Sequence, residues 1–323
     1  MKVLFCGKGF PDAHRRLAEF LPAAGHEFID CPEGDIIGHL DGVDVIIPTI
    51  ARIDSDILGR GSFGLVQQFG VGLDAVDIDA ATRFGVWVAR VPSSSSGNAA
   101  SVAELAMYLM IGLSRKQAEM LRVFKSRMVG QPIGMALLNK TACIVGMGNV
   151  GKALASRLST CGMRLTAVVD RPEHNISFGA VVGRFYPLAG LKEAVADADY
   201  TVLCINYHAG LHNLIDRDVL SSIKRGSFLV NVARGGLVNH DDLLEALRSG
   251  RLAGAGIDVF WEEPVNPDHP LFRHNVIATP HIGGVTDVSY DGISAVCVEN
   301  ITRYSKGEEP LYIANRPTKP RLR

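Results

Sequence analysis

The chain has 323 residues, of which 47% are hydrophobic and 21% charged, and its formal net charge is -1. This length suffices for about two domains of roughly 150 residues each. The composition excludes intrinsic disorder, which needs low hydrophobicity and high net charge. The even charge balance argues against a nucleic-acid partner, because no basic excess attracts phosphates. No apolar run approaches the roughly 20 residues of a membrane span, so we expect no membrane partner either.

Six cysteines are scattered along the chain without a Cys-x-x-Cys pair. Free cysteines in apolar segments behave as small hydrophobic residues. We therefore expect neither a disulfide framework nor a thiolate metal site, and no metal ion. Because disulfides are rare in a reducing cytosol, the protein is expected to be cytoplasmic.

The first hundred residues alternate short apolar runs with amphipathic stretches. This pattern is typical of parallel strands with helices on both faces of the sheet. The predicted strands are Lys2–Cys6, Glu27–Asp30, Val43–Pro48, Leu65–Phe69 and Val86–Ala89.

A long apolar helical pattern over residues 99–127 follows a loop that contains four consecutive serines. A helix this apolar does not suit a plain surface position. We expect it to bridge two lobes and to form part of a subunit interface.

A second series of strands begins after this helix. It comprises Ala142–Val145, Leu165–Val169, Tyr200–Ile205, Phe228–Val232, Gly254–Val259 and Val276–Ala278. A helix over about 284–306 then returns to the first lobe. The tail after Glu308 contains three prolines and is predicted to be extended and poorly ordered.

The fold class is therefore predicted as α/β, with two doubly wound parallel-sheet lobes. Residues 99–282 would form the second lobe. They are inserted into a first lobe made of residues 1–98 and 283–323.

A glycine-rich turn joins the first strand of the second series to a helix, in the pattern G-x-G-x-x-G. Gly146 permits the tight turn, Gly148 lets the backbone approach a pyrophosphate, and Gly151 allows close helix–strand packing. The N–H groups at the start of the helix, at Asn149 and Val150, then face the phosphates.

Asp170 ends the next predicted strand, nineteen residues after Gly151. A carboxylate there can accept hydrogen bonds from both ribose hydroxyls of NAD, and it repels the 2′-phosphate of NADP. Arg171 could instead turn towards a 2′-phosphate. We predict NAD as the cofactor and keep NADP as the less favoured alternative.

Arg234, Glu263 and His281 each follow a predicted strand of the second series. In an open α/β sheet the ligand crevice lies at the carboxyl ends of the strands, so these side chains are expected to converge. An imidazole suits proton transfer near neutral pH. A guanidinium can hold a carboxylate in two hydrogen bonds.

These segments resemble the D-isomer-specific 2-hydroxyacid dehydrogenases, the family of D-phosphoglycerate dehydrogenases and glyoxylate/hydroxypyruvate reductases. The resemblance extends over essentially the whole chain, with the motifs in the family's order. The matching segments are Gly70–Asp74, Asn98–Glu104, Gly146–Gly151 with Asp170, Asn231–Gly235, Asp258–Pro264 and Thr279–His281.

The resemblance implies a Rossmann NAD-binding domain inserted into a flavodoxin-like substrate domain. It implies that the enzyme interconverts a small 2-keto acid and its D-2-hydroxy acid by hydride transfer. His281 would be the acid/base, Glu263 would fix its tautomer, and Arg234 would hold the substrate carboxylate. A homodimer is also expected.

Further contacts follow from the same resemblance. Ala233, Asp258 and Gly283 would touch the cofactor, with Asp258 at the nicotinamide carboxamide. The N–H groups of Val71 and Gly72 would bind the substrate carboxylate from the first lobe. Asn98 is an additional candidate for substrate binding. Independently of the resemblance, Arg52 is either an extra anion contact from the first lobe or a solvated charge beside a helix.

Two alternative functions remain open. One is an NADH-sensing binding protein like the corepressors that share this fold. The other is a dehydrogenase of formate or phosphite, because Arg234 could hold those anions as well. The segment Asn206–Gly210 also departs from the family's Pro-Leu-Thr at the cofactor wall.

Overall fold

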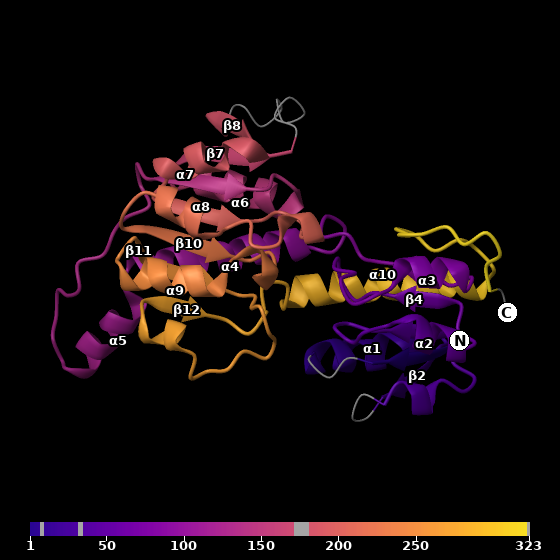
Figure 1. Ribbon diagram of the computed structural model, residues 1–323. Coiled ribbons are helices and arrows are strands. Elements are labelled where there is room, and N and C mark those ends of the chain that lie inside the picture. Colours follow the sequence, from indigo (N-terminus) through magenta and orange to yellow (C-terminus); the bar gives the residue numbers. More distant parts are fainter. Residues whose placement is uncertain (7–9, 32–34, 171–180, 322–323) are drawn as a thin grey trace. The chain divides into compact units, whose positions relative to one another are not determined.

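The computed structural model describes residues 1–6, 10–31, 35–170 and 181–321 (Figure 1). The chain divides into two compact units. We call Met1–Asn98 with Val285–Arg323 the discontinuous unit and Ala99–Gly284 the continuous unit. The continuous unit extends two residues past the predicted boundary at 282.

The described residues of the discontinuous unit form a parallel sheet in the order β2-β1-β3-β4-β5. This is the flavodoxin-like order 2-1-3-4-5, so the predicted fold of this lobe is confirmed. The strands are β1 (Lys2–Phe5), β2 (Glu27–Asp30), β3 (Val45–Ile47), β4 (Leu65–Gln67) and β5 (Trp87–Ala89).

Alternate residues of these strands face opposite layers of helices. Val3 and Phe5 pack with α1 (Pro11–Ala23) and α10 (Asp287–Ser305). Leu4 and Cys6 pack on the other face, with α2 (Ser55–Arg60) and α3 (Ile78–Arg83). The strands β1, β3, β4 and β5 are therefore buried on both faces, which is why they read as continuous apolar runs, whereas the edge strand β2 is partly exposed.

The prediction of a poorly ordered tail is wrong for residues 308–321. Ile313 forms an antiparallel bridge with Ala89, and the Val88 N–H donates to the side chain of Asn315 at 2.8 Å. The reason is that β5 is an edge strand with backbone groups that need partners. The tail supplies them.

The described residues of the continuous unit form a parallel sheet in the order β12-β11-β10-β9-β6-β7-β8. Counted from β6, this is the Rossmann order 3-2-1-4-5-6 with one more strand, as predicted. Figure 1 shows these strands from β8 at the top of the view to β12 below. They are β6 (Thr141–Val145), β7 (Arg164–Val169), β8 (Arg184–Pro187), β9 (Tyr200–Leu203), β10 (Ser227–Asn231), β11 (Leu252–Ile257) and β12 (Val276–Ala278).

Helices cover both faces of this sheet too. One buried cluster joins Ala142 and Ile144 to α4 (Asn98–Ser114) and α6 (Asn149–Thr160). The opposite cluster joins Cys143 and Val145 to three further helices. These are α7 (Leu191–Ala196), α8 (Arg217–Ser222) and α9 (His240–Arg248).

The single helix predicted over 99–127 is in fact two helices. After α4 ends at Ser114, Lys116 adopts a left-handed conformation (φ 55°), and α5 starts at Gln117 and ends at Lys125. The Lys116 N–H bonds to the Leu113 carbonyl, three residues back, which closes the last turn of α4. The apolar periodicity continues across this break, so the pattern carried no signal for it. Within the described parts of the chain, every helix is too short or too polar to cross a membrane.

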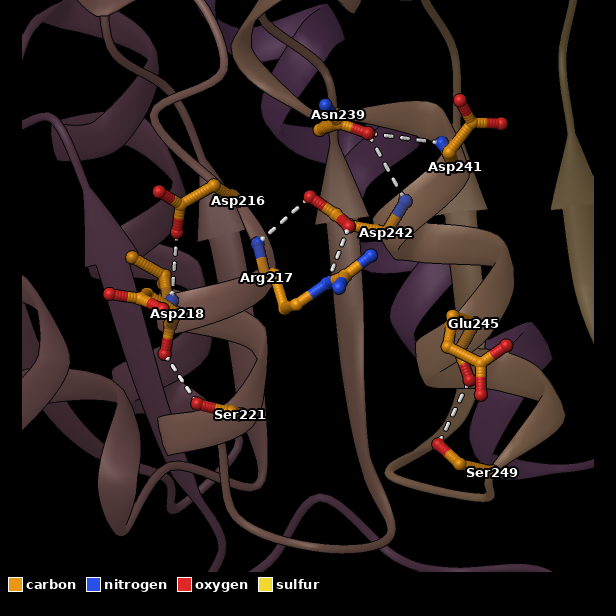
Figure 2. Close-up of polar contacts among 10 residues, drawn as sticks. Asp216, Arg217, Asp218, Ser221, Asn239, Asp241, Asp242, Glu245 and Ser249 are labelled. Carbon is orange, nitrogen blue, oxygen red and sulfur yellow. Dashed lines mark hydrogen bonds and ion pairs between the residues drawn. The ribbon is translucent and has the colours of Figure 1, made fainter.

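Figure 2 shows how polar side chains fix the starts of α8 and α9. Asp216 caps α8, and Asn239 accepts the N–H groups of Asp241 and Asp242 at the start of α9. Arg217 then joins the two helices through Asp242, to which both its N–H and its Nε donate.

Candidate active site

Three neighbouring strands end at the residues with predicted catalytic roles. Arg234 follows β10, Glu263 follows β11 and His281 follows β12, and these strands are adjacent in the sheet. Because parallel strands end at the same edge, the three segments meet there.

His281 and Glu263 are in direct contact. Nδ1 of His281 lies 2.8 Å from Oε2 of Glu263, and the two side chains are 33% and 29% exposed. An ionised carboxylate only accepts hydrogen bonds, so Nδ1 carries the proton of this contact. Nε2 is the second nitrogen of the ring.

The carboxyl group of Glu263 is held ionised by its surroundings. Burial, the largest single cause, raises its pKa, but it is outweighed by the combined effect of the hydrogen bond and charge of His281, the Phe260 N–H and the charge of Arg234. The net result is a pKa below the ordinary value of 4.5. The Phe260 N–H donates to Oε1 at 2.9 Å. The positive charge of Arg234 thus favours the ionised form of Glu263.

A buried asparagine holds the segment that carries Arg234. The Asn231 side chain donates to the Arg234 carbonyl at 2.9 Å and accepts the Ala233 N–H at 3.1 Å. Nη1 of Arg234 donates to the Ala233 carbonyl at 2.7 Å. At Gly235 a Cβ atom would lie 1.9 Å from the carbonyl oxygen of Phe260, so glycine is required for this close approach.

The loop that carries His281 is organised by Asp258. This carboxylate is 2% exposed. It accepts hydrogen bonds from the Thr279 hydroxyl (2.7 Å) and from the N–H groups of Ile282 (2.8 Å) and Gly283 (2.9 Å). His281 itself has a left-handed backbone (φ 56°). A non-glycine residue persists in that conformation only where its surroundings over-determine it, often at a functional site.

The glycine turn after β6 fits a dinucleotide. A Cβ atom at Gly151 would lie 2.0 Å from the Gly146 carbonyl oxygen, and one at Gly146 (φ 100°) would lie 2.6 Å from the Ile205 backbone. At Gly148, by contrast, nothing lies within 4 Å of a Cβ. The first two glycines are needed by the fold, whereas Gly148 leaves open space for a ligand at the start of α6.

The other predicted cofactor residues lie around the same sheet edge. Asp170 directly follows β7 and is exposed, and Asn149 and Val150 begin α6. Arg171 lies outside the described residues. Ala233, Asp258 and Gly283 are buried, and their hydrogen bonds hold the protein's own loops. Their cofactor contacts stay predictions.

Four predicted substrate residues belong to the discontinuous unit. Val71 and Gly72 are partly exposed in the turn after β4, and Arg52 is exposed in the loop after β3. The Asn98 side chain donates to the Ser289 hydroxyl near the start of α10 at 3.2 Å. Both residues of this bond belong to the discontinuous unit.

Sequence reasoning missed the supporting residues of the site. Thr279 and Asn231 lay within recognised motifs, but no role was assigned to them. Their polar side chains next to apolar strands were the available signal. In the described residues, no group of three histidine, cysteine, aspartate or glutamate side chains is placed to hold a metal ion.

Comparison with known proteins gives consistent matches. The family model for the NAD binding domain of D-isomer specific 2-hydroxyacid dehydrogenases matches residues 107–283. A glyoxylate reductase of Thermococcus onnurineus is 30% identical over 287 residues, which is 85% of this chain and 83% of that protein.

Two solved structures are similar over nearly their whole length. A protein of Thermus thermophilus has a TM-score of 0.85 at 30% identity, covering 98% of this chain and 100% of that one. An NAD-dependent formate dehydrogenase of Staphylococcus aureus, solved in complex with NAD, has a TM-score of 0.80 at 29% identity, covering 95% of this chain and 96% of that one.

Two glycine variants should separate folding from cofactor binding. Gly148→Ala should weaken NADH binding at least tenfold, because its methyl group enters the open space, while changing the free energy of unfolding by less than about 1 kcal/mol. Gly151→Ala should lower the thermal midpoint, because its Cβ meets the Gly146 carbonyl. Calorimetric titration measures the NADH affinity of each variant, and thermal unfolding measures its stability. Unchanged NADH affinity in a folded Gly148→Ala protein contradicts this assignment of the cradle.

Glu263→Gln should be less stable than the wild type at neutral pH, and the difference should vanish in acid. The folded-state pKa of Glu263 is lowered, so its stabilising contribution is complete above the ordinary value of 4.5 and is lost as the pH falls through the lower folded value. Thermal unfolding of both proteins between pH 3 and 7 checks this. If the difference in stability between the two proteins stays constant from pH 3 to 7, the lowered pKa of Glu263 is contradicted.

Proposed function

Because the chain belongs to the D-isomer specific 2-hydroxyacid dehydrogenase family and is an NAD-dependent enzyme of that family, we propose that it interconverts a small 2-keto acid and its D-2-hydroxy acid. The observation that carries this proposal is the hydrogen bond between His281 and Glu263, together with the positive charge of Arg234 that acts on Glu263. Similarity to a glyoxylate reductase makes glyoxylate the first substrate to test.

His281 is the proposed acid/base. In the direction of reduction, Nε2–H of the protonated imidazole donates its proton to the oxygen of the substrate carbonyl as that oxygen gains negative charge. Glu263 accepts from Nδ1, which keeps the ring oriented and stabilises its positive form before the transfer. In the reverse direction, neutral Nε2 removes the hydroxyl proton.

Arg234 is the proposed anchor of the substrate carboxylate. A guanidinium offers two parallel N–H donors to a carboxylate, and its charge also draws electron density from the neighbouring carbonyl. The backbone bonds from Asn231 support this role, because they fix the segment from which the side chain extends.

The discontinuous unit contributes further substrate contacts in this proposal. The N–H groups of Val71 and Gly72 bind the carboxylate, and the exposed Arg52 adds positive charge. Asn98, whose side chain donates to the Ser289 hydroxyl, is the fourth substrate contact that we assign to this unit.

Bound NADH supplies the hydride that reduces the carbonyl carbon. The open space at Gly148 and the start of α6 suit the pyrophosphate. We assign Asp170 to the ribose hydroxyls, a position that disfavours NADP. Ala233, Asp258 and Gly283 line the nicotinamide end in this assignment.

Formate oxidation is the second candidate function. It is favoured by the 29% identity with the formate dehydrogenase of Staphylococcus aureus. Formate is an anion that Arg234 could hold, but its oxidation yields carbon dioxide and needs no proton transfer to a carbonyl oxygen.

The function is tested by NADH oxidation with a panel of 2-keto acids and by NAD reduction with formate. We expect turnover of at least one 2-keto acid, and a His281→Ala variant should lose about 10²- to 10⁴-fold in kcat while binding NADH normally. His39→Ala, a histidine of the other unit, is the control. Wild-type kcat in the His281→Ala protein, or turnover of formate alone, contradicts the proposal.

We also propose that the protein is a homodimer through α4 and α5. Several large apolar side chains of these helices are exposed, including Tyr108 (46%), Ile111 (43%) and Phe124 (79%). Tyr108, Ile111 and Met120 also line a hollow in this surface. Contiguous exposed apolar residues typically mark interaction sites.

The double variant Tyr108→Glu/Ile111→Glu should convert a dimer to a monomer, because two charges enter the apolar contact. Light scattering after size-exclusion chromatography measures the molar mass. Ile37→Glu, which changes an exposed apolar residue of the other unit, should leave the mass unchanged. A wild-type protein that is monomeric at micromolar concentration rules the proposal out.

A further inference from the structure

A buried glutamine links two loops of the discontinuous unit. Gln68 directly follows β4 and is 6% exposed. The loop after β3 carries Arg52, and the turn after β4 carries Val71 and Gly72. We propose that Gln68 is a positioning residue that holds this turn in the conformation that binds the substrate carboxylate. The inference rests on the proposed function, in which this turn contacts substrate.

The side-chain amide of Gln68 is fully used. Nε2 donates to the carbonyl oxygens of Thr49 (2.9 Å) and Gly72 (2.5 Å). Oε1 accepts from the Phe69 N–H at 3.0 Å. Because Nε2 faces two carbonyls and Oε1 faces an N–H, these partners determine the orientation of the amide. One side chain thus joins both loops.

The backbone of both loops is in conformations that need such support. Thr49 has a φ of 53°, which is unfavourable for a residue with a side chain. Gly70 has a φ of 128°, in a region that glycine alone adopts readily. The turn therefore starts at a glycine and is closed by the bond from Gln68 to Gly72.

The turn held in this way presents donors to an anion. The N–H groups of Val71 and Gly72 donate to no backbone carbonyl of the described residues. Both residues are partly exposed. Successive N–H groups in a turn form a concave anion-binding site. Gln68 is neutral, so it supports the turn without placing a negative charge beside a bound carboxylate.

The adjacent Gln67 offers a matched control. It is fully buried, and its Oε1 accepts from the side chain of Asn300 on α10 at 2.8 Å. Its Nε2 donates to the Gln68 carbonyl at 2.9 Å. Since successive residues of a strand point to opposite faces, removing the Gln67 amide disturbs the α10 side of the sheet and the bond to the Gln68 carbonyl. It leaves in place the bonds of the Gln68 side chain that hold the turn.

The test compares Gln68→Met with Gln67→Met. Gln68→Met should raise the KM for glyoxylate about 10- to 100-fold at saturating NADH, because the carboxylate contact is displaced. Its KM for NADH should stay within twofold of the wild type. Hydrogen exchange at the Ile53 amide, which bonds to the Ala75 carbonyl across the two loops, should become at least tenfold faster. Gln67→Met should show neither effect.

Gln68→Leu serves as a second variant if Gln68→Met fails to fold, since it also loses both donors and adds no charge. Unchanged exchange in the Gln68 variants, or the same change in Gln67→Met, overturns the positioning role. Faster exchange with an unchanged glyoxylate KM overturns the link to substrate.

If the wild-type protein reduces no 2-keto acid, the proposed function fails, whatever the Gln68 variants show. In that event, calorimetric titration with oxalate decides the inference. Oxalate binding that is at least tenfold weaker in Gln68→Met than in wild type and Gln67→Met supports it, and equal binding overturns it.

Discussion

The buried carboxylate of Asp258 fixes the conformation of the loop on which the proposed chemistry depends. A charge taken out of water is costly unless hydrogen bonds replace its hydration. Thr279, Ile282 and Gly283 provide these bonds, so segment 279–283 has little freedom to take another path. The left-handed backbone of His281 is a consequence. The imidazole of His281 lies 2.8 Å from Glu263 in this conformation.

Both units use the same physical arrangement. Their strands are parallel, so the loops with special backbone conformations gather where the strands end. In the continuous unit these loops carry Arg234, Glu263 and His281, and in the discontinuous unit they carry the turn at Gly70. Buried polar side chains hold such loops in each case: Asp258 holds the His281 loop and Asn231 the Arg234 segment, while Gln68 holds the turn at Gly70. Rigid supports of this kind reduce the reorganisation needed when a substrate binds.

Local patterns were sufficient to predict most strands and the glycine turn. The run that became β6 is apolar at every central position because both of its faces are buried, and the turn that follows it depends on glycines close in sequence. The pairing of strand ends followed from topology alone. Thus Arg234, Glu263 and His281 could be placed at one edge without coordinates.

Features that depend on distant contacts could not be predicted. Thr279 and Asp258 are 21 residues apart, and nothing local indicates their hydrogen bond. The short strand β8 lacks an apolar run, and its sequence Arg-Phe-Tyr-Pro gives no strand signal. The tail was misjudged because its order comes from the edge of β5. Gln68 lay inside the predicted strand Leu65–Phe69 without a role, because nothing local indicates its bonds to Thr49 and Gly72.

The discontinuous unit also sets an order of events during synthesis. One layer of its core needs Tyr290, Ile293 and Cys297 of α10 against strands made from the first residues of the chain. The continuous unit can complete its own core while it emerges from the ribosome, since domains generally fold as units during translation. The first strands must wait for α10, nearly the whole length of the protein later. Nascent chains that are stopped before this helix would leave an apolar sheet face uncovered, and such chains are natural clients for chaperones.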